Sequence, residues 1–177
     1  MRVLVTGVGN QLGHDIMNEL YRQRHFAIGT DVQEEYPGVD DRSAAALSTY
    51  TKLDISDIKE ASMVLKKEKP DAVICCSFCS VKTDGITDMS VLKQIAEVCS
   101  EIECKLISVV PIRNNSSLPD IDELSGICDR CFTIYIPDGK KNCPEYTRIL
   151  AGKLVTLAAT EDYGVYTVVD DDNLIHN

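Results

Sequence analysis

Three glycines near the start of the chain have the spacing of a turn that binds phosphate. Gly7, Gly9 and Gly13 follow the apolar run Val3-Leu4-Val5 and lead into a helix-like segment from Asp15 to Gln23. A buried strand that ends in such a turn and opens a helix directs free backbone N–H groups, and the positive end of the helix dipole, at one point. That point suits a pyrophosphate, so the sequence predicts a dinucleotide site here.

A second element of such a site follows at the expected distance. Ala27–Asp31 reads as the next strand, and Asp31 stands at its carboxyl end, where its side chain can accept hydrogen bonds from an adenosine ribose. Because a carboxylate there repels a 2′-phosphate, we expect NAD to be preferred over NADP. The alternative is that Gly7 and Gly13 only permit a tight turn and close packing, and that Asp31 is a solvated strand end.

Two CxxC pairs suggest a different chemistry. Cys76 with Cys79, and Cys128 with Cys131, would together offer four thiolates to zinc. Their separation is well beyond that of a zinc ribbon, and the first pair follows a predicted strand, so zinc and a redox dithiol are both disfavoured. The other four cysteines read as small buried hydrophobic residues: Cys75, Cys99, Cys104 and Cys143.

The remaining titratable residues singled out by the sequence are expected to lie at the solvated surface. His14 lies inside the first predicted helix, His25 before the second strand and His176 in a frayed tail, and we expect all three at the surface. The three consecutive aspartates at 170–172 are expected to be solvated, as runs of like charge usually are. The acidic residues at 120–123 suit the start of a helix, where the helix dipole favours negative charge. We therefore predict no metal site and assign no catalytic role to these groups.

These residues are carried by strand-like and helix-like segments that alternate along the chain. The strand-like segments are Arg2–Thr6, Ala27–Asp31, Tyr50–Asp54, Ala72–Ser77, Lys105–Val110, Cys131–Ile136 and Val165–Val169. The helix-like segments are Gln11–Gln23, Ser56–Lys69, Met89–Ile102, Asp120–Asp129 and Pro144–Glu161. Short apolar strands that alternate with amphipathic helices predict an α/β fold of the Rossmann type, a doubly wound and mostly parallel sheet with helices on both faces.

Three of the helix starts have a local explanation. Ser56 or Asp57 is expected to cap the second helix, and Asp88 or Ser90 the third. Pro144 suits the first turn of the last helix, since proline needs no hydrogen-bond acceptor there.

Composition bounds the classes of function. The chain has 177 residues, of which 44% are hydrophobic, and fits one domain. Its net charge of -10, without a basic stripe, argues against nucleic acid or an anionic membrane surface as a partner. The sequence shows no membrane span or signal peptide, so we expect reduced thiols and a cytoplasmic location.

Several segments of the chain resemble a known family. They look like dTDP-4-dehydrorhamnose reductase, an extended short-chain dehydrogenase/reductase, and are Val3–Gly7, Gln11–Gly13, Thr30–Asp31, Leu53–Asp57 and Lys69–Ile74. The resemblance is specific across residues 1–77 and weaker through 92–110 and 146–169. It implies NAD(P)-dependent reduction of a nucleotide-linked 4-keto sugar during rhamnose biosynthesis.

The resemblance also implies roles for individual residues. It assigns the pyrophosphate to Gly7, Asn10, Gln11, Leu12 and Gly13, the adenosine ribose to Asp31, and the adenine to Asp54 and Ile55. It places Cys76, Ser77 and Phe78 beside the central part of the cofactor. Gly9 and Ser108 complete the set of candidate cofactor-binding residues.

The chain departs from the family in the cofactor site. Asn10 stands where the family has glycine, with Gly9 one place early. Because asparagine tolerates left-handed backbone, we expect the turn to survive with altered geometry. Phe78 stands where a small residue is usual, and its bulk would obstruct the dinucleotide.

The departures are larger in the catalytic part. The family uses a tyrosine acid with a lysine four positions later, and none of the seven tyrosines here has that partner. Ser108 is kept from a Ser-Thr-Asp sequence whose other two residues are lost. We therefore predict a single domain: a nucleotide-binding core over 1–110, a shortened connection and strand over 111–143, and a remnant of the substrate domain over 144–177.

Three functions remain open at this point. The preferred one is a dinucleotide-binding or regulatory module without catalysis of its own, a pseudoenzyme that pairs with a full-length homologous enzyme. The alternatives are a reductase acting on a nucleotide-sugar with Tyr135 or Tyr146 and Ser108, and a structural domain with a vestigial motif. A lost substrate domain would also expose an apolar patch on 144–161 and favour a homo-oligomer.

Overall fold

The computed structural model describes residues 1–38, 43, 48–76, 89–112, 130–140, 142–161, 164–170 and 173–176. Within them the strands form one 8-stranded sheet in the order β3-β2-β1-β4-β5-β6-β7-β8. The strands are β1 (Arg2–Thr6), β2 (Phe26–Asp31), β3 (Thr49–Lys52), β4 (Ala72–Cys75), β5 (Lys105–Ile112), β6 (Cys131–Pro137), β7 (Gly164–Asp170) and β8 (Asn173–His176). All neighbouring pairs from β3 to β7 are parallel, and β8 alone pairs antiparallel.

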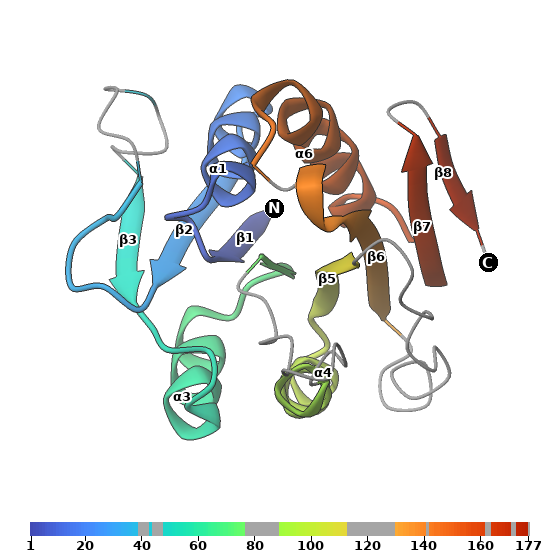
Figure 1. The fold of residues 1–177 in the computed structure, drawn as a ribbon. Helices are drawn as coiled ribbons and strands as arrows, with labels where there is room; N and C mark the ends of the chain where they lie inside the picture. The colour runs from blue at the N-terminus through green and yellow to red at the C-terminus, as the bar shows by residue number, and fades with distance from the viewer. Residues whose placement is uncertain are drawn as a thin grey trace.

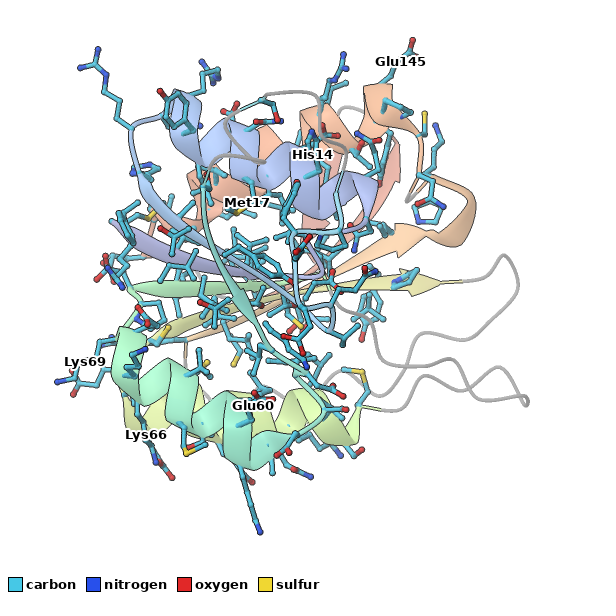
Figure 2. All side chains as sticks on the ribbon, turned by 90° about the vertical axis from the view of Figure 1, so that its left-hand side faces the viewer. His14, Met17, Glu60, Lys66, Lys69 and Glu145 are labelled. Carbon is cyan, nitrogen blue, oxygen red and sulfur yellow. The ribbon has the colours of Figure 1, made fainter. Side chains whose placement is uncertain are left out.

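Helices cover both faces of the sheet. On one face lie α1 (Gln11–Arg22) and α6 (Pro144–Ala158), and on the other α3 (Ile58–Glu68) and α4 (Ser90–Glu101), as Figure 1 shows. Figure 2 shows the layers edge on, with His14 and Met17 of α1 on one side of the sheet and Glu60 and Lys66 of α3 on the other. A single-turn 3-10 helix, η1 (Asp138–Lys140), follows β6.

The core consists of two apolar layers, one on each face of the sheet. In β4, Ala72 and Ile74 join the layer under α1 and α6, whereas Val73 and Cys75 join the layer under α3 and α4. All four residues are buried, as expected of a parallel strand with helices on both sides. The predicted α/β Rossmann-type fold is confirmed.

The β6–α6–β7 crossover differs in hand from the β1–α1–β2 and β4–α4–β5 crossovers. β1–α1–β2 and β4–α4–β5 step in opposite directions along the sheet and carry their helices on opposite faces, so they share one hand. β6–α6–β7 steps in the same direction as β4–α4–β5, yet α6 contacts α1 on the other face. Parallel crossovers are nearly always right-handed, so β1–α1–β2 and β4–α4–β5 have the usual hand and β6–α6–β7 is left-handed. It places α6 beside α1 on the same face of the sheet.

Most predicted elements form within a few residues of their predicted bounds. Asp57 caps α3, accepting hydrogen bonds from the backbone N–H groups of Lys59 and Glu60, and Pro144 opens α6, both as predicted. The capping residue predicted for α4, Asp88 or Ser90, is wrong: the N-cap residue is Met89, whose side chain makes no capping hydrogen bond. The helix predicted over 120–129 lies outside the described residues.

The end of the chain contradicts the expectation of a frayed tail. β8 (Asn173–His176) pairs with β7, with His176 opposite Tyr166, so His176 lies in a strand. The pairing explains the difference, because a strand of only four residues gains its order from a neighbouring strand rather than from its own sequence. None of the described helices is long and apolar enough to cross a membrane.

Candidate functional site

The glycine turn joins β1 to α1 at the carboxyl edge of the sheet. Gly7 has a φ of 71°, and its N–H donates to the Thr30 carbonyl of β2 at 2.8 Å. A Cβ on Gly13 would lie 2.3 Å from the Gly7 carbonyl oxygen. The turn therefore needs glycine at both positions, one for its left-handed backbone and one for close approach of the helix.

Asn10 supplies the N-cap of α1 and also ties the turn to β4. Its Oδ1 accepts from the Gly13 N–H at 2.8 Å, and its Nδ2 donates to the Cys76 carbonyl at 3.1 Å. Its φ of -91° and ψ of 161° are extended. The tolerance of asparagine for left-handed backbone is not used here, because Gly7 takes the positive φ and Asn10 has the ordinary backbone of a capping residue.

Two backbone donors of the turn point to no protein acceptor. Across the described residues, the N–H groups of Gly7, Val8, Gly9, Asn10 and Gly13 are all bonded within the protein, whereas those of Gln11 and Leu12 are not. These are the first two N–H groups of α1, at the positive end of the helix dipole. The turn can therefore receive an anion at Gln11 and Leu12.

Asp31 lies across the turn, at the end of β2. Its Oδ2 accepts from the Gly9 N–H at 2.9 Å and its Oδ1 from the Val32 N–H at 2.8 Å. Each carboxylate oxygen keeps accepting capacity beyond its one bond, and the residue is only half-buried. Asp31 is thus a fixed, accessible negative charge beside the glycine turn.

A segment that follows β2 covers part of the turn, and we call residues 32–38 the β2 extension. Pro37 lies so close to Gly9 that a Cβ there would be 2.7 Å from the Pro37 Cγ. The Tyr50 hydroxyl donates to the Gln33 carbonyl at 2.6 Å. Burial, with the negative charges of Asp31 and Glu34, raises the pKa of Tyr50, which keeps that donor protonated.

The β2 extension is also attached to α1 through His14. The His14 Nδ1 lies 2.7 Å from the Tyr36 hydroxyl, and its Nε2 lies 3.1 Å from the Asn18 amide nitrogen. These two contacts hold the imidazole ring between Tyr36 and Asn18. The expectation of a surface His14 is wrong: the side chain is buried, with 6% of its surface exposed, beneath Tyr36 from a distant segment.

Asp54 and Ile55 follow β3 near the Asp31 end of β2. The Leu53 N–H donates to the Asp31 carbonyl at 2.8 Å, which joins the two strand ends. The Asp54 carboxylate accepts from the Ser56 hydroxyl at 2.6 Å and from its N–H at 2.9 Å, and these bonds lower the pKa of Asp54. Asp54 is exposed and Ile55 is buried.

Cys76 ends the buried run of β4. Its N–H donates to the Thr6 carbonyl at 3.3 Å, and burial, with a smaller effect of Cys75, raises the pKa of its thiol well above the ordinary value. A protonated, enclosed thiol suits neither zinc nor redox exchange. The described residues also hold no cluster of three or more metal-ligating side chains. Ser77, Phe78, Cys79 and Cys128 lie outside the described residues.

Three of the four cysteines predicted to be buried are buried. They are Cys75, Cys99 and Cys104. Cys143 is only half-buried, because it precedes the first turn of α6 rather than lying within an apolar layer.

Ser108 is buried on β5 beside β4. Its hydroxyl has no hydrogen-bond partner among the described residues, and 1% of the residue is exposed. Its neighbours on the same side of β5, Leu106 and Val110, belong to the α3 and α4 layer, as does Tyr135. Tyr146 belongs to the opposite layer. The structure therefore brings Ser108 and Tyr135 to one face and separates Tyr146 from them.

A cavity of about 490 Å³ lies between α1 and α6, apart from most of this site. Of the predicted site residues that the structure describes, only Gln11 lines it, together with Asp15, Pro144 and Arg148 among others. Beside the cavity, the Thr147 hydroxyl donates to the Asp15 carboxylate at 2.6 Å, which links the two helices.

Sequence reasoning missed two features of the site. The capping role of Asn10 had a local signal, since an asparagine directly precedes the helix. The attachment of Tyr36 to His14 had none, because it depends on how the segment after β2 returns over α1.

Comparison with known proteins identifies the fold. No protein-family model and no curated protein sequence matches the chain. Among solved structures, it is similar to WbmH of Bordetella bronchiseptica in complex with NAD+, at 13% identity over 94% of this chain and 74% of that chain, with a TM-score of 0.66.

Two further structures are similar to the same degree. One is dTDP-4-dehydrorhamnose reductase of Bacillus anthracis in complex with NADP, at 16% identity over 94% of this chain and 74% of that chain, with a TM-score of 0.66. The other is a hypothetical dTDP-4-dehydrorhamnose reductase of Sulfolobus tokodaii, at 18% identity over 99% and 78%, with a TM-score of 0.67. At these identities the likeness establishes a shared Rossmann-type fold.

Proposed function

We propose that the chain binds a nicotinamide dinucleotide at the carboxyl edge of its sheet and is a binding or regulatory module without reductase chemistry of its own. The observation that carries the proposal is the pair of unbonded N–H groups of Gln11 and Leu12 in the glycine turn, with the fixed carboxylate of Asp31 across from them. The NAD+ and NADP complexes of structures with the same fold support this ligand class.

The residues of the turn fit the parts of a dinucleotide. Gln11 and Leu12 would donate to the pyrophosphate, and Asp31 would accept from the adenosine ribose. Asp54 and Ile55 would border the adenine, because their strand end is hydrogen-bonded to that of Asp31. Gly7, Gly9, Asn10 and Gly13 would shape the turn, and Cys76, Ser77, Phe78 and Ser108 would border the central part of the cofactor.

NAD is the preferred dinucleotide in this proposal. The carboxylate of Asp31 is held by two backbone N–H groups, so it has little freedom to move away from a 2′-phosphate. Repulsion between these two anions would lower the affinity for NADP.

Two features support a module rather than an independent reductase. The sequence contains no tyrosine with a lysine four positions later. Tyr146 lies on the opposite face of the sheet from Ser108.

The net charge of -10 disfavours nucleic acid as a partner, and we propose a cytoplasmic protein that pairs with a full-length homologous enzyme or with a second copy of itself.

One observation favours reductase activity as the second candidate. The unpartnered Ser108 hydroxyl and Tyr135 share a face, so this pair could position a carbonyl and supply a proton. In that case the substrate would be a nucleotide-linked 4-keto sugar. A structural domain with a vestigial motif is the third candidate.

Calorimetry with NAD+, NADH, NADP+ and NADPH tests the proposal. We expect NAD+ and NADH to bind more tightly than their phosphorylated counterparts, and no turnover of a dTDP-linked 4-keto sugar. Turnover that is lost in both Ser108→Ala and Tyr135→Phe would favour the reductase instead. If none of the four dinucleotides binds at millimolar concentration, only the structural domain remains.

A further inference from the structure

The side chain of Asn10 binds the third N–H of the helix turn whose first two N–H groups the proposed function assigns to the pyrophosphate. Its Oδ1 accepts the Gly13 N–H at 2.8 Å, which is the third N–H of the first turn of α1. Its Nδ2 is held by the Cys76 carbonyl at 3.1 Å. The amide is therefore fixed at both ends, between the helix and the end of β4.

The Asn10 oxygen uses the same kind of donor that a phosphate oxygen would use. A phosphate on a helix N-terminus binds through N–H groups of the first turn. A phosphate at the N–H groups of Gln11 and Leu12 would bring its anionic oxygens against the Asn10 Oδ1. This oxygen carries partial negative charge and is bonded to the next N–H of the helix, that of Gly13. The two acceptors repel each other, so one of them must move.

Moving the Asn10 side chain has a definite consequence. It breaks two hydrogen bonds, to Gly13 and to Cys76, and leaves the Cys76 carbonyl without this donor. Because this rearrangement costs free energy, it weakens the binding of the dinucleotide by the same amount.

We propose that Asn10 is an affinity-determining residue that competes with the pyrophosphate for the first turn of α1 and keeps dinucleotide affinity low. This inference rests on the proposed function. It assigns the chain a site that fills only when the dinucleotide is abundant, because binding must first displace the protein's own acceptor.

Asn10→Gly is the direct test. Glycine is tolerated at the N-cap, so the helix is kept while the competing oxygen is removed. In calorimetry of the full chain, we expect this variant to bind NAD+ and inorganic pyrophosphate about tenfold more tightly than the wild type. A tenfold change in affinity corresponds to the net free energy of about one hydrogen bond. Asn10→Asp keeps the cap and adds negative charge, so its affinity for both should fall.

Asp57→Gly is the matched control. Asp57 caps α3 as Asn10 caps α1, with bonds to the Lys59 and Glu60 N–H groups at 3.0 Å and 3.2 Å, but α3 lies on the other face of the sheet. We expect this variant to leave pyrophosphate affinity unchanged. An equal gain in Asp57→Gly would attribute the effect to cap loss in general and overturn the inference.

A measurement on the wild type avoids dependence on a folded variant. The Asn10 side-chain amide protons should change their NMR shifts and lose protection from exchange when the protein is saturated with NAD+. Two outcomes would overturn the inference and leave the proposed function standing. In one, the wild type binds NAD+ while the Asn10 amide does not move; in the other, the wild type binds and Asn10→Gly binds equally well or more weakly. If neither protein binds NAD+ or pyrophosphate, both are overturned.

Discussion

Asp31 accepts a hydrogen bond from the Gly9 backbone N–H at 2.9 Å and thereby joins the end of β2 to the turn after β1. The bond orients a carboxylate towards the turn before any ligand arrives. It also stabilises the conformation in which Pro37 of the β2 extension lies against Gly9. One side chain therefore has a structural role and, in the proposed function, a role in cofactor choice.

Asp31→Ala should separate these roles. Without the carboxylate, we expect NAD+ affinity to fall about tenfold or more, because hydrogen bonds to a charged acceptor are lost. NADP+ should lose less, so the preference between the two narrows. Calorimetry with both ligands measures this change. Glu34→Gln is the control, since Glu34 is an exposed carboxylate of the β2 extension that pairs with Lys52; a comparable change in preference there would contradict a specific role for Asp31.

Gly13→Ala should destabilise the fold strongly. Its Cβ would lie 2.3 Å from the Gly7 carbonyl oxygen and 2.8 Å from the Val8 Cα, and both are backbone atoms that cannot rotate away. We expect a loss of about 2 kcal/mol or more in the free energy of unfolding, measured by urea denaturation. Apart from its chain neighbours, no heavy atom of the described residues lies within 4 Å of a Cβ on Gly139, so Gly139→Ala should stay within about 0.5 kcal/mol of the wild type. Equal losses of unfolding free energy in the two variants would show that the close backbone contact at Gly13 does not determine the effect of the substitution.

The sequence was sufficient for features that depend on local pattern. The apolar runs of β1 and β4 predict strands buried on both faces, and Asp57 predicts the start of α3, because each signal lies within its own segment. The burial of His14 was not predictable in this way, since it requires Tyr36 to return over α1. The conformation of Asn10 was not predictable from its residue type either: asparagine tolerates left-handed backbone, but the positive φ belongs to Gly7, three residues earlier.

Thr147→Val should weaken the contact between α1 and α6. The Thr147 hydroxyl donates to the Asp15 carboxylate at 2.6 Å, and only 8% of Asp15 is exposed. Valine has a similar shape but no donor, which leaves the carboxylate with the Gln11 amide as its remaining partner in the described structure. We expect a loss of about 1–3 kcal/mol in unfolding free energy. Thr147→Ser retains the hydroxyl and should recover most of it; a serine variant as unstable as the valine variant would point to packing instead.

Asp54 should titrate below the ordinary range of a carboxyl group. The Ser56 hydroxyl and N–H both donate to it and stabilise its charged form, which lowers its pKa. The stabilisation is therefore present at neutral pH and is lost as the pH falls through the lowered pKa. NMR titration of the Asp54 carboxyl carbon measures this. In Ser56→Ala the pKa should move up towards the ordinary value, and an unchanged pKa would show that the hydroxyl bond has no effect.

The described cysteines should differ in reactivity with a thiol reagent. Reaction requires an accessible thiolate, and burial both encloses Cys76 and raises the pKa of its thiol. Cys143 is half-buried at the start of α6 and should react first. Peptide mapping by mass spectrometry after brief exposure to iodoacetamide at pH 8 distinguishes the two sites. Cys143→Ser should remove the early modification without exposing Cys76, whereas Cys76 labelled as fast as Cys143 in the native protein would mean that the end of β4 opens to solvent.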